Sequence, residues 1–268
     1  MQTLIPGQYA GQNRSQYKIP GLIFTRCFFP KAFNSDWHSH ENSHLTLSLK
    51  GGSIEKRKNG SISCSPGILL LYPANELHRN TDYVSNSASF SIEFENDWCK
   101  HLEIKNHEGN RQNMINDPLI KLNIIKIMGE IKLADGLSDL CMETTVLNIL
   151  SALDHHDVEN KRPLWINRIY ELLHDEYNGN HSLASLSEKL KIHPVTISKY
   201  FPKYFKTNIG DYTRKIRTER SLNDLCRKSL AIEDIAVKHG FVDNAHFTRV
   251  FKKHTGITPS QYRHLTTG

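Results

Sequence analysis

Residues 232–263 read IEDIAVKHGFVDNAHFTRVFKKHTGITPSQYR, and the pattern of this segment occurs a second time earlier in the chain. The earlier copy occupies residues 183–212, and its apolar positions align with those of the later copy. Ile197, for example, aligns with Phe247 at a separation of 50 residues. In both copies a short helical pattern, a turn and a second helical pattern follow one another, which indicates two helix-turn-helix units in one polypeptide.

The second helix of each unit is expected to have an inner and an outer face. The apolar positions at helical spacing, which are predicted to face the core, are Ile197, Tyr200, Phe201, Phe247, Val250 and Phe251. The outward positions are Val195, Thr196, Ser198 and Lys199 in the earlier unit and Asn244, Ala245, Thr248 and Arg249 in the later one. Arginine pairs bidentately with guanine and asparagine with adenine, and small or methyl-bearing side chains contact the thymine methyl group. These residue types therefore fit a DNA major groove.

The positive charge of the chain is concentrated in its last third. Residues 160–268 contain 19 Lys and Arg against 10 Asp and Glu, a net charge of +9, whereas the remainder has 15 against 18, a net charge of −3. This asymmetry indicates that a polyanion meets the C-terminal part, although charge alone leaves a merely solvated basic face as the alternative. The residues expected to contact phosphates, which give affinity without sequence choice, are Lys203, Lys206, Arg214, Lys252 and Lys253.

The C-terminal segment resembles the DNA-binding domain of the AraC/XylS family of bacterial transcription regulators. The resemblance covers residues 163–263 and is carried by Ile-Ala at 235–236, Gly240-Phe241, Phe247, Arg249, Val250-Phe251-Lys252-Lys253, Gly256, Thr258-Pro259 and Tyr262-Arg263. In that family a long helix, here about Gly210–Arg227, joins the two units, and their second helices enter successive major-groove faces about one helical turn apart. By position, the resemblance gives as base-reading residues Val195, Ser198, Lys199, Asn244, Ala245, Thr248 and Arg249.

The resemblance also implies a function. It implies a sequence-specific, effector-responsive regulator of the activator type, with double-stranded DNA, RNA polymerase and a small-molecule effector as partners. The first unit departs from the family pattern, because Ser187 replaces the usual Ala, and Lys191 and Lys206 stand where Gly is usual. Pro202 lies inside the second helix of that unit, where it removes a backbone hydrogen bond and is expected to kink the last turn. The later unit therefore matches the family more closely.

The chain is expected to have an α+β, two-domain fold. Residues 1–112 are predicted to form an all-β sensing domain, a barrel or sandwich, from short apolar runs separated by Gly, Pro and Asn. The clearest runs are Leu22–Phe29, Leu45–Leu49, Ile68–Tyr72 and Ala88–Phe94. Residues 113–158 show helical periodicity and are predicted to form a helical hairpin, a polar linker follows at 154–163, and residues 163–265 form the DNA-binding domain.

The N-terminal region contains two histidine-bearing segments, WHSHENSH at 37–44 and GILLLYPANELH at 67–78. They resemble the paired motifs of the cupin barrel, a common sensor in AraC-type regulators. The cupin metal set is His-x-His, a Glu four residues on and a later His; here His38, His40 and His78 match it, and His44 replaces the Glu. Imidazoles that converge in a barrel can bind Zn, Fe, Ni or Cu. We favour a metal-free interpretation, in which the histidines either line an effector pocket or have a structural role; the candidate pocket residues are Trp37, His38, His40, His44 and His78.

The predicted hairpin has two interpretations. In AraC-type proteins this region commonly makes the homodimer contact, which the resemblance favours here. The alternative is an intramolecular packing face, and amphipathic periodicity alone does not distinguish the two.

Other classes of protein fit the sequence less well. The five cysteines are scattered without a C-x-x-C pair, which argues against a disulfide framework or zinc knuckle and fits a reducing cytoplasm. The N-terminus lacks a signal-peptide pattern, and no apolar run approaches the roughly 20 residues needed to span a membrane. One rival is a metal-dependent cupin enzyme tethered to a DNA-binding domain, and another is a DNA-repair protein, which would need a zinc-bound cysteine cluster. Because no catalytic triad or phosphate-cradling glycine loop is visible, we predict neither an enzyme nor a cofactor.

Overall fold

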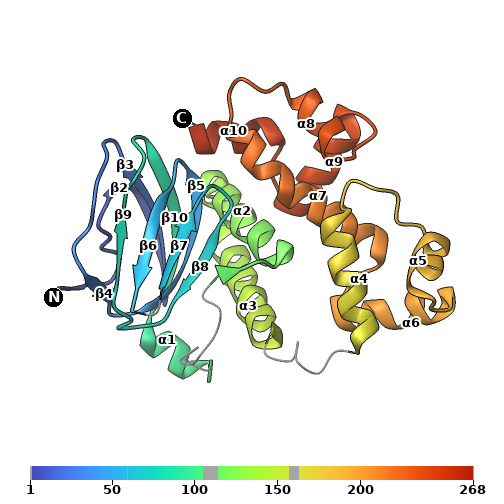
Figure 1. Cartoon of the computed structure of the whole chain (residues 1–268). Helices are drawn as coiled ribbons and strands as arrows, with labels where there is room; N and C mark the ends of the chain where they lie inside the picture. Colours follow the sequence, from blue (N-terminus) through green and yellow to red (C-terminus); the bar gives the residue numbers. More distant parts are fainter. Residues whose placement is uncertain (1, 59, 105–113, 157–162, 268) are drawn as a thin grey trace. The chain divides into compact units, whose positions relative to one another are not determined.

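The computed structural model describes residues 2–58, 60–104, 114–156 and 163–267. The chain divides into two compact units, residues 1–117 with 265–268, and residues 118–264. The first unit is rich in strands and the second is helical (Figure 1). The expected combination of a β-rich N-terminal region and a helical C-terminal region is therefore confirmed. The predicted boundary at 112–113 and most of the predicted linker lie outside the described residues.

The β-rich unit contains eleven strands and one short helix among its described residues. The strands are β1 (Gln2–Leu4), β2 (Gln12–Ile19), β3 (Leu22–Phe29), β4 (His38–His40), β5 (Ser43–Lys50), β6 (Ser53–Arg57), β7 (Gly60–Cys64), β8 (Leu69–Tyr72), β9 (His78–Thr81), β10 (Ser87–Phe94) and β11 (Met114–Ile115), and the helix is α1 (Asn96–His101). The four apolar runs that the sequence singled out are found in β3, β5, β8 and β10.

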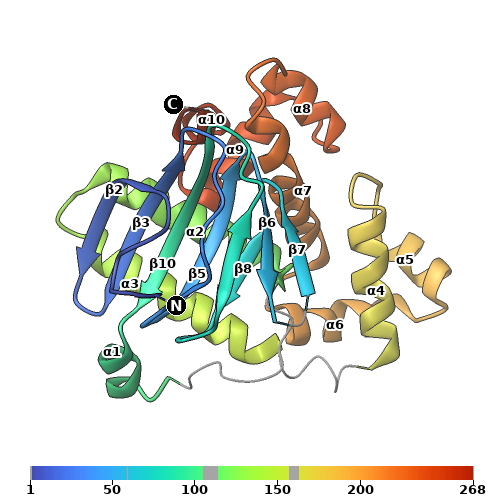
Figure 2. The ribbon, with the colours of Figure 1, turned by 60° about the vertical axis from the view of Figure 1, so that its left-hand side comes forward.

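The described strands form two hydrogen-bonded sheets. One has the order β1-β4-β9-β6-β7 and the other β11-β8-β5-β10-β3-β2. Figure 2 shows β10 between β3 and β5 in the second sheet. The expected barrel is thus not closed over the part of the chain described here, because the outer strands of the two sheets do not pair with each other. Two stacked sheets need no such closure, since their inner faces bury each other's side chains.

The second sheet is centred on strands whose residues are buried on both faces. Every residue of β3 except Arg26 and Phe28 is buried, and β10 is similar, whereas the edge strand β2 is exposed over most of its length. Leu22, Phe24 and Leu45 are each at most 1% exposed. Polar residues are also buried here, among them Thr25, Ser91 and Glu93. A polar interior of this kind requires hydrogen-bond partners inside the unit or in a bound ligand.

The helical unit contains nine helices among the described residues. They are α2 (Pro118–Leu133), α3 (Ser138–His156), α4 (Leu164–Asp175), α5 (Leu183–Leu190), α6 (Pro194–Phe205), α7 (Ile209–Leu225), α8 (Ile232–Lys238), α9 (Asn244–Thr255) and α10 (Pro259–Thr267), whose last residues are grouped with the β-rich unit. Helices α5 and α6 form the first helix-turn-helix unit, α8 and α9 form the second, and α7 is the helix between them. Helices α2 and α3 form a hairpin that contacts α7 and α9 through α2.

Each helix-turn-helix unit has an apolar core. The core of the first is formed by Ile169, Leu173, Leu186, Ile197, Phe201, Ile209, Tyr212 and Ile216. In the second, Phe247 and Phe251 are fully buried and Phe241 is 4% exposed, with neighbouring aromatic rings in contact. The approach of α2 to the second unit is close, because a Cβ at Gly129 would lie 2.7 Å from Ile257 Cγ2. Among the helices described, none has the length and apolar character needed to cross a bilayer.

Candidate nucleic-acid interface and sensor pocket

The recognition helix of the second unit, α9, has well-defined ends. Asp243 is its N-cap and accepts a hydrogen bond from the His246 backbone N–H at 2.6 Å. Gly256 ends it in the left-handed conformation with φ of 76°. A capped N-terminus and a glycine stop are the usual boundaries of a short stable helix, so the local sequence alone fixes the length of α9.

The two faces of α9 separate as the periodicity predicts. Phe247 and Phe251 are fully buried and Val250 is 6% exposed. On the other face Asn244, Ala245 and Arg249 are exposed and Thr248 is half-buried, with its hydroxyl 3.4 Å from Asn244 Oδ1. The structure therefore brings the four proposed base-reading residues of this unit together on one surface of one helix.

The corresponding helix of the first unit, α6, begins with Pro194 after a His193 N-cap. Val195, Ser198 and Lys199 are exposed on it, and Val195 reaches 61% exposure. Pro202 lies within α6, and the helix continues to Phe205. Lys206 then adopts the left-handed conformation with φ of 54°, the position where the family usually has glycine.

One prediction for α6 was wrong. Tyr200 was expected in the core, but it is 37% exposed. The ammonium groups of Lys203 and Lys199 lie 4.7 Å and 5.6 Å from the centre of its ring. Cation–π attraction of this kind stabilises a ring at the surface. The structure thus adds an exposed aromatic residue to the surface of α6, which spacing alone assigned to the interior.

The residues proposed for phosphate contacts are all at least partly accessible. Lys203, Lys206 and Lys252 are exposed. Lys253 and Arg214 both donate to Oδ1 of Asp211 on α7, at 3.0 Å and 3.3 Å. Burial opposes ionisation of Asp211, but the hydrogen bond from Lys253 and the neighbouring positive charges hold the pKa of its carboxyl group below the usual value. Two of the five candidates therefore belong to an ion-pair network anchored on α7.

In the β-rich unit, four of the five predicted pocket residues converge. His38, His40, His44 and His78 line one pocket together with Tyr9 and Tyr72. His38 and His78 lie opposite each other in the pairing of β4 with β9. Trp37 is not among the lining residues, and its ring lies 5.2 Å from the guanidinium carbon of Arg79.

The rings of His38 and His78 are held in defined orientations by backbone carbonyl groups. Nδ1 of His38 lies 2.8 Å from the Asp36 carbonyl oxygen, and Nδ1 of His78 lies 2.9 Å from that of Glu76. Because each carbonyl oxygen accepts from an Nδ1–H group, Nε2 is the nitrogen of each ring that is left to meet a ligand. Burial lowers the pKa of His40 to about 3 and that of His78 to about 2, in both cases with a contribution from His38. These two rings are therefore neutral at physiological pH.

Three of these side chains could hold a metal ion. One nitrogen from each of His38, His40 and His78 lies within 4.8 Å of the others. The donor set is all nitrogen, because the nearby buried carboxylates bind other groups: Glu55 accepts from Arg57, Tyr72 and Asn80, and Glu93 accepts from Gly7 and Asn42. The residues thus fit an imidazole-bound divalent transition metal and do not supply the carboxylate of a two-His-one-carboxylate site.

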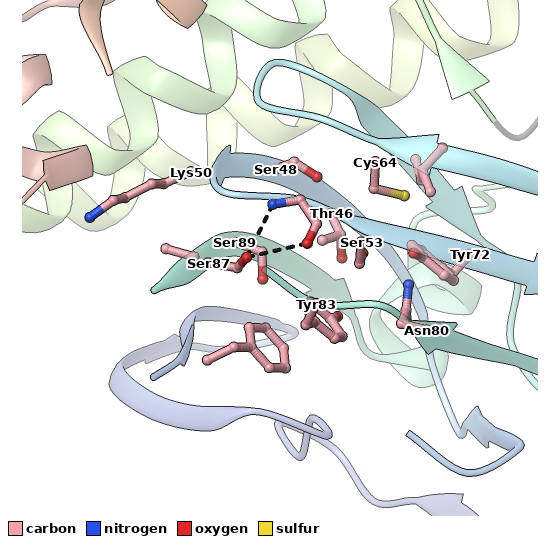
Figure 3. Close-up of a pocket in the computed structure, with 14 residues that line it drawn as sticks. Thr46, Ser48, Lys50, Ser53, Cys64, Tyr72, Asn80, Tyr83, Ser87 and Ser89 are labelled. Atoms are coloured by element: carbon pink, nitrogen blue, oxygen red, sulfur yellow. Dashed lines mark hydrogen bonds between the residues drawn. The ribbon is translucent and has the colours of Figure 1, made fainter. Parts of the chain in front are cut away.

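A second pocket adjoins the first and shares lining residues with it, among them Thr46, Tyr72 and Asn80. It holds about 390 Å³ of empty space, its opening to solvent included. Figure 3 shows residues that line it from both sheets, including several hydroxyl-bearing side chains. These are Thr46, Ser48, Ser53, Tyr72, Tyr83, Ser87 and Ser89. No local sequence signal marks this set, because its members come from four strands and one loop.

The C-terminal region is similar to known helix-turn-helix regulators. Residues 186–264 match the family described as helix-turn-helix domain. The probable transcription factor PqrA of Proteus vulgaris is 30% identical over 100 residues, which are 37% of this chain and 82% of PqrA. The arabinose operon regulatory protein of Escherichia coli is 23% identical over 235 residues, or 82% of this chain and 79% of that protein. The Msm operon regulatory protein of Streptococcus mutans is 28% identical over 148 residues, or 55% of this chain, and the match spans only 50% of that protein.

Proposed function

The chain belongs to the AraC/XylS family of transcription regulators, and on this premise we propose that it binds double-stranded DNA at specific sequences under the control of a small-molecule effector. The observation that carries the proposal is that α9 has one buried face and one exposed face. Asn244 and Arg249 project from a helix whose opposite face is fixed by Phe247 and Phe251 in the core. A rigid helix that presents Asn and Arg to solvent matches the chemistry of base-edge recognition in the major groove.

The decisive experiment is sequencing of the genomic fragments that the purified full-length protein retains at physiological salt. We expect a recurring site with two blocks about one helical turn apart, because two recognition helices in one chain read successive turns of one DNA face. The double variant Asn244→Ala with Arg249→Ala should lose the block read by α9 and keep the other. Retention of fragments that share no sequence in the wild type would contradict the proposal.

The effector is proposed to bind between the two sheets of the β-rich unit. The adjoining pockets offer imidazole, phenol, hydroxyl and amide groups, which suit a small polar molecule with several hydrogen-bonding groups. Binding there would change DNA affinity through a coupling free energy between the two sites. Candidate effectors, chosen from the pathway of the genes beside the recovered site, should shift DNA affinity in the wild type. Ser89→Leu, which fills the pocket, should abolish the shift and preserve the affinity measured without effector.

A divalent transition-metal ion is the second candidate for the effector. The specific observation is the orientation of His38 and His78, whose Nδ1–H groups are committed to backbone carbonyls, as occurs in metal-binding histidines. Elemental analysis of protein purified without a histidine tag tests it. Near-stoichiometric metal that disappears in the His38→Ala, His78→Ala double variant would support this candidate, and its absence after aerobic and anaerobic preparation would retire it.

The hairpin is proposed to contribute to a homodimer. Leu140 and Leu147 are seven residues apart on α3, and they are 63% and 39% exposed. Residues at this spacing share a helix face, so α3 presents an apolar stripe to solvent. Analytical ultracentrifugation should show a dimer that is lost in Leu140→Glu. The matched control is Thr144→Ser, at an exposed position on the same face. A monomeric wild type would remove this part of the proposal.

We also propose that the chain is an activator and that it acts on RNA polymerase. A reporter placed downstream of the recovered site should show transcription that rises with the amount of the protein. Transcription that falls would identify a repressor instead.

A further inference from the structure

One arginine side chain forms hydrogen bonds to the backbone of both helix-turn-helix units. Arg217 lies on α7, and its guanidinium donates to three backbone carbonyl oxygens. Nε donates to Tyr177 at 2.9 Å and Nη2 to Gly179 at 2.7 Å, both in the segment between α4 and α5 of the first unit. Nη1 donates to Gly240 at 2.6 Å, in the turn between α8 and α9 of the second unit. A single side chain thus binds the backbone of both units.

The backbones of the two units also touch beside this arginine. Gly240 has a φ of 77°, and a Cβ at this position would lie 3.0 Å from the Asn178 carbonyl oxygen and 3.1 Å from Cζ of Arg217. Gly240 therefore serves two needs, because only glycine adopts this backbone conformation at low cost and only glycine leaves room for the approach. The rings of Tyr177 and His239 extend the contact, with centroids 5.9 Å apart.

The chemistry of the guanidinium makes this contact directional. Its N–H groups point in fixed directions within one plane, so three bonds to three carbonyls define how the two backbone segments lie relative to that plane. A lysine ammonium is a point charge that imposes no such geometry. Each unit is held internally by its own apolar core, so the contact around Arg217 acts on the angle and distance between α6 and α9.

We propose that Arg217 is a positioning residue that fixes the separation of the recognition helices α6 and α9, and thereby the spacing of the two DNA blocks that the chain accepts. The proposal rests on the proposed DNA-binding function. Two helices that enter successive major grooves must match the helical repeat of DNA, about 10.5 base pairs. A rigid link makes one spacing strongly preferred, and a loosened link makes several spacings acceptable.

The test compares spacing preference between variants of the full-length protein. The probe is the duplex recovered from a random-sequence pool by the wild type, together with duplexes that carry two extra base pairs between the blocks or one scrambled block. We expect the insertion to weaken wild-type binding roughly tenfold or more, and to weaken Arg217→Gln only about threefold or less. Binding of the variant to the one-block duplex should stay within about twofold of wild type, because neither recognition helix is changed.

Arg168→Gln is the matched control, because it removes the same charge from an exposed position on α4. It should keep the spacing preference of the wild type. Circular dichroism and thermal unfolding establish that the variants are folded, and Arg217→Lys, which keeps the charge and loses the fork, replaces Arg217→Gln if that variant is unfolded. Unfolding of both variants would assign Arg217 to domain stability alone and overturn the proposal.

Three further results of the binding measurements would contradict either the role of Arg217 or the DNA-binding function. A variant that binds every duplex more weakly by the same factor, with an unchanged preference for one spacing, would overturn the proposal. A wild type that recognises both blocks and tolerates the insertion would do the same and leave the DNA-binding function intact. A wild type that recovers no shared sequence from the pool would instead refute the proposed function.

Discussion

Lys121 on α2 and Glu219 on α7 form an ion pair of 2.7 Å, and their side chains are only 7% and 12% exposed. This pair joins the hairpin to the helix that links the two helix-turn-helix units. Helix α2 packs against α7 and α9 within one compact unit. The hairpin therefore supports the second DNA-reading unit directly.

Removing one partner of this pair should destabilise the helical unit. Lys121→Met leaves the Glu219 carboxylate poorly compensated in a nearly buried position, and we expect the free energy of unfolding to fall by about 2–4 kcal/mol. Urea denaturation followed by circular dichroism measures the change. The double variant Lys121→Met with Glu219→Met should recover much of the loss, because no charge is left buried. A single variant as stable as wild type would show that the pair is solvated in solution.

Arg249→Ala should relax sequence choice at one position of the site. If the exposed guanidinium pairs with a base, its loss costs about 1–3 kcal/mol on the preferred sequence and little on sequences with another base there. Binding measurements with the four single-base variants of the recovered site give the result. Equal weakening on all four would mean that Arg249 contacts phosphate.

Lys252→Ala should weaken binding to every DNA by a similar factor. When a lysine binds a DNA phosphate, condensed counterions are released. Removal of the lysine should therefore reduce the slope of log affinity against log salt by about one. The measurement is a salt titration of wild type and variant on the same duplex. Exchange of Lys228, which is exposed and outside the proposed contacts, serves as the charge-matched comparison. An unchanged slope would remove Lys252 from the interface.

Acid should weaken the helical unit through His254, whose side chain is 6% exposed beside Asp211. Burial lowers the pKa of His254 to about 4, and the Asp211 carboxylate offsets this only in part. An unfolded histidine has a pKa near 6.5, so unfolding takes up a proton between about pH 4 and 6.5. This contribution to stability is complete above pH 6.5 and is lost as the pH falls toward 4.

His254→Gln should flatten the pH dependence of the free energy of unfolding in that window, as measured by urea denaturation at half-unit steps. The pKa of Asp211 is also lowered, so its stabilising contribution is lost only below the ordinary aspartate pKa of about 3.9, outside the window. The same steepness in the variant would show that another group titrates.

Lys191→Gly should stabilise the first unit. Lys191 ends α5 in the left-handed conformation with φ of 57°, where a Cβ is unfavourable and its side chain is exposed. We expect a gain of about 0.5–1 kcal/mol in the free energy of unfolding. Glu188→Gly, within the same helix, should lower the free energy of unfolding by about 1 kcal/mol, because glycine is unfavourable inside a helix. A loss at position 191 would show that Lys191 makes contacts that outweigh the strain.

The helical half of the fold could be predicted because its signals are local. Caps, turns and the spacing of Phe247, Val250 and Phe251 lie within a few residues of one another, so the two faces of α9 follow from the sequence. Tyr200 was misplaced because its helical position borders both faces and the lysines beside it hold the ring at the surface. Arg217 was overlooked because its acceptors are carbonyl groups 23 to 40 residues away, which no side-chain pattern marks.

The β-rich half was harder to predict from the sequence, because its arrangement depends on pairing between strands that are distant in the chain. The convergence of His38, His40 and His78 was anticipated through the cupin resemblance, whereas strand spacing alone would not have placed His38 opposite His78. The separation into two sheets depends on which outer strands find partners, and the short apolar runs are compatible with both arrangements. The hydroxyl-lined pocket is assembled from loops and strands distant in sequence, so its composition became visible only in the folded unit.

The separation of α9 into a buried and an exposed face also has a consequence for the evolution of such a regulator. The side chains that face solvent on this helix are separate from those that hold it in the core. With Asn244 and Arg249 as the proposed base-reading residues, a substitution at either would redirect the protein to a different operator while the fold persists. After gene duplication, one copy could acquire a new regulon through a few surface exchanges and need no compensating change in its interior.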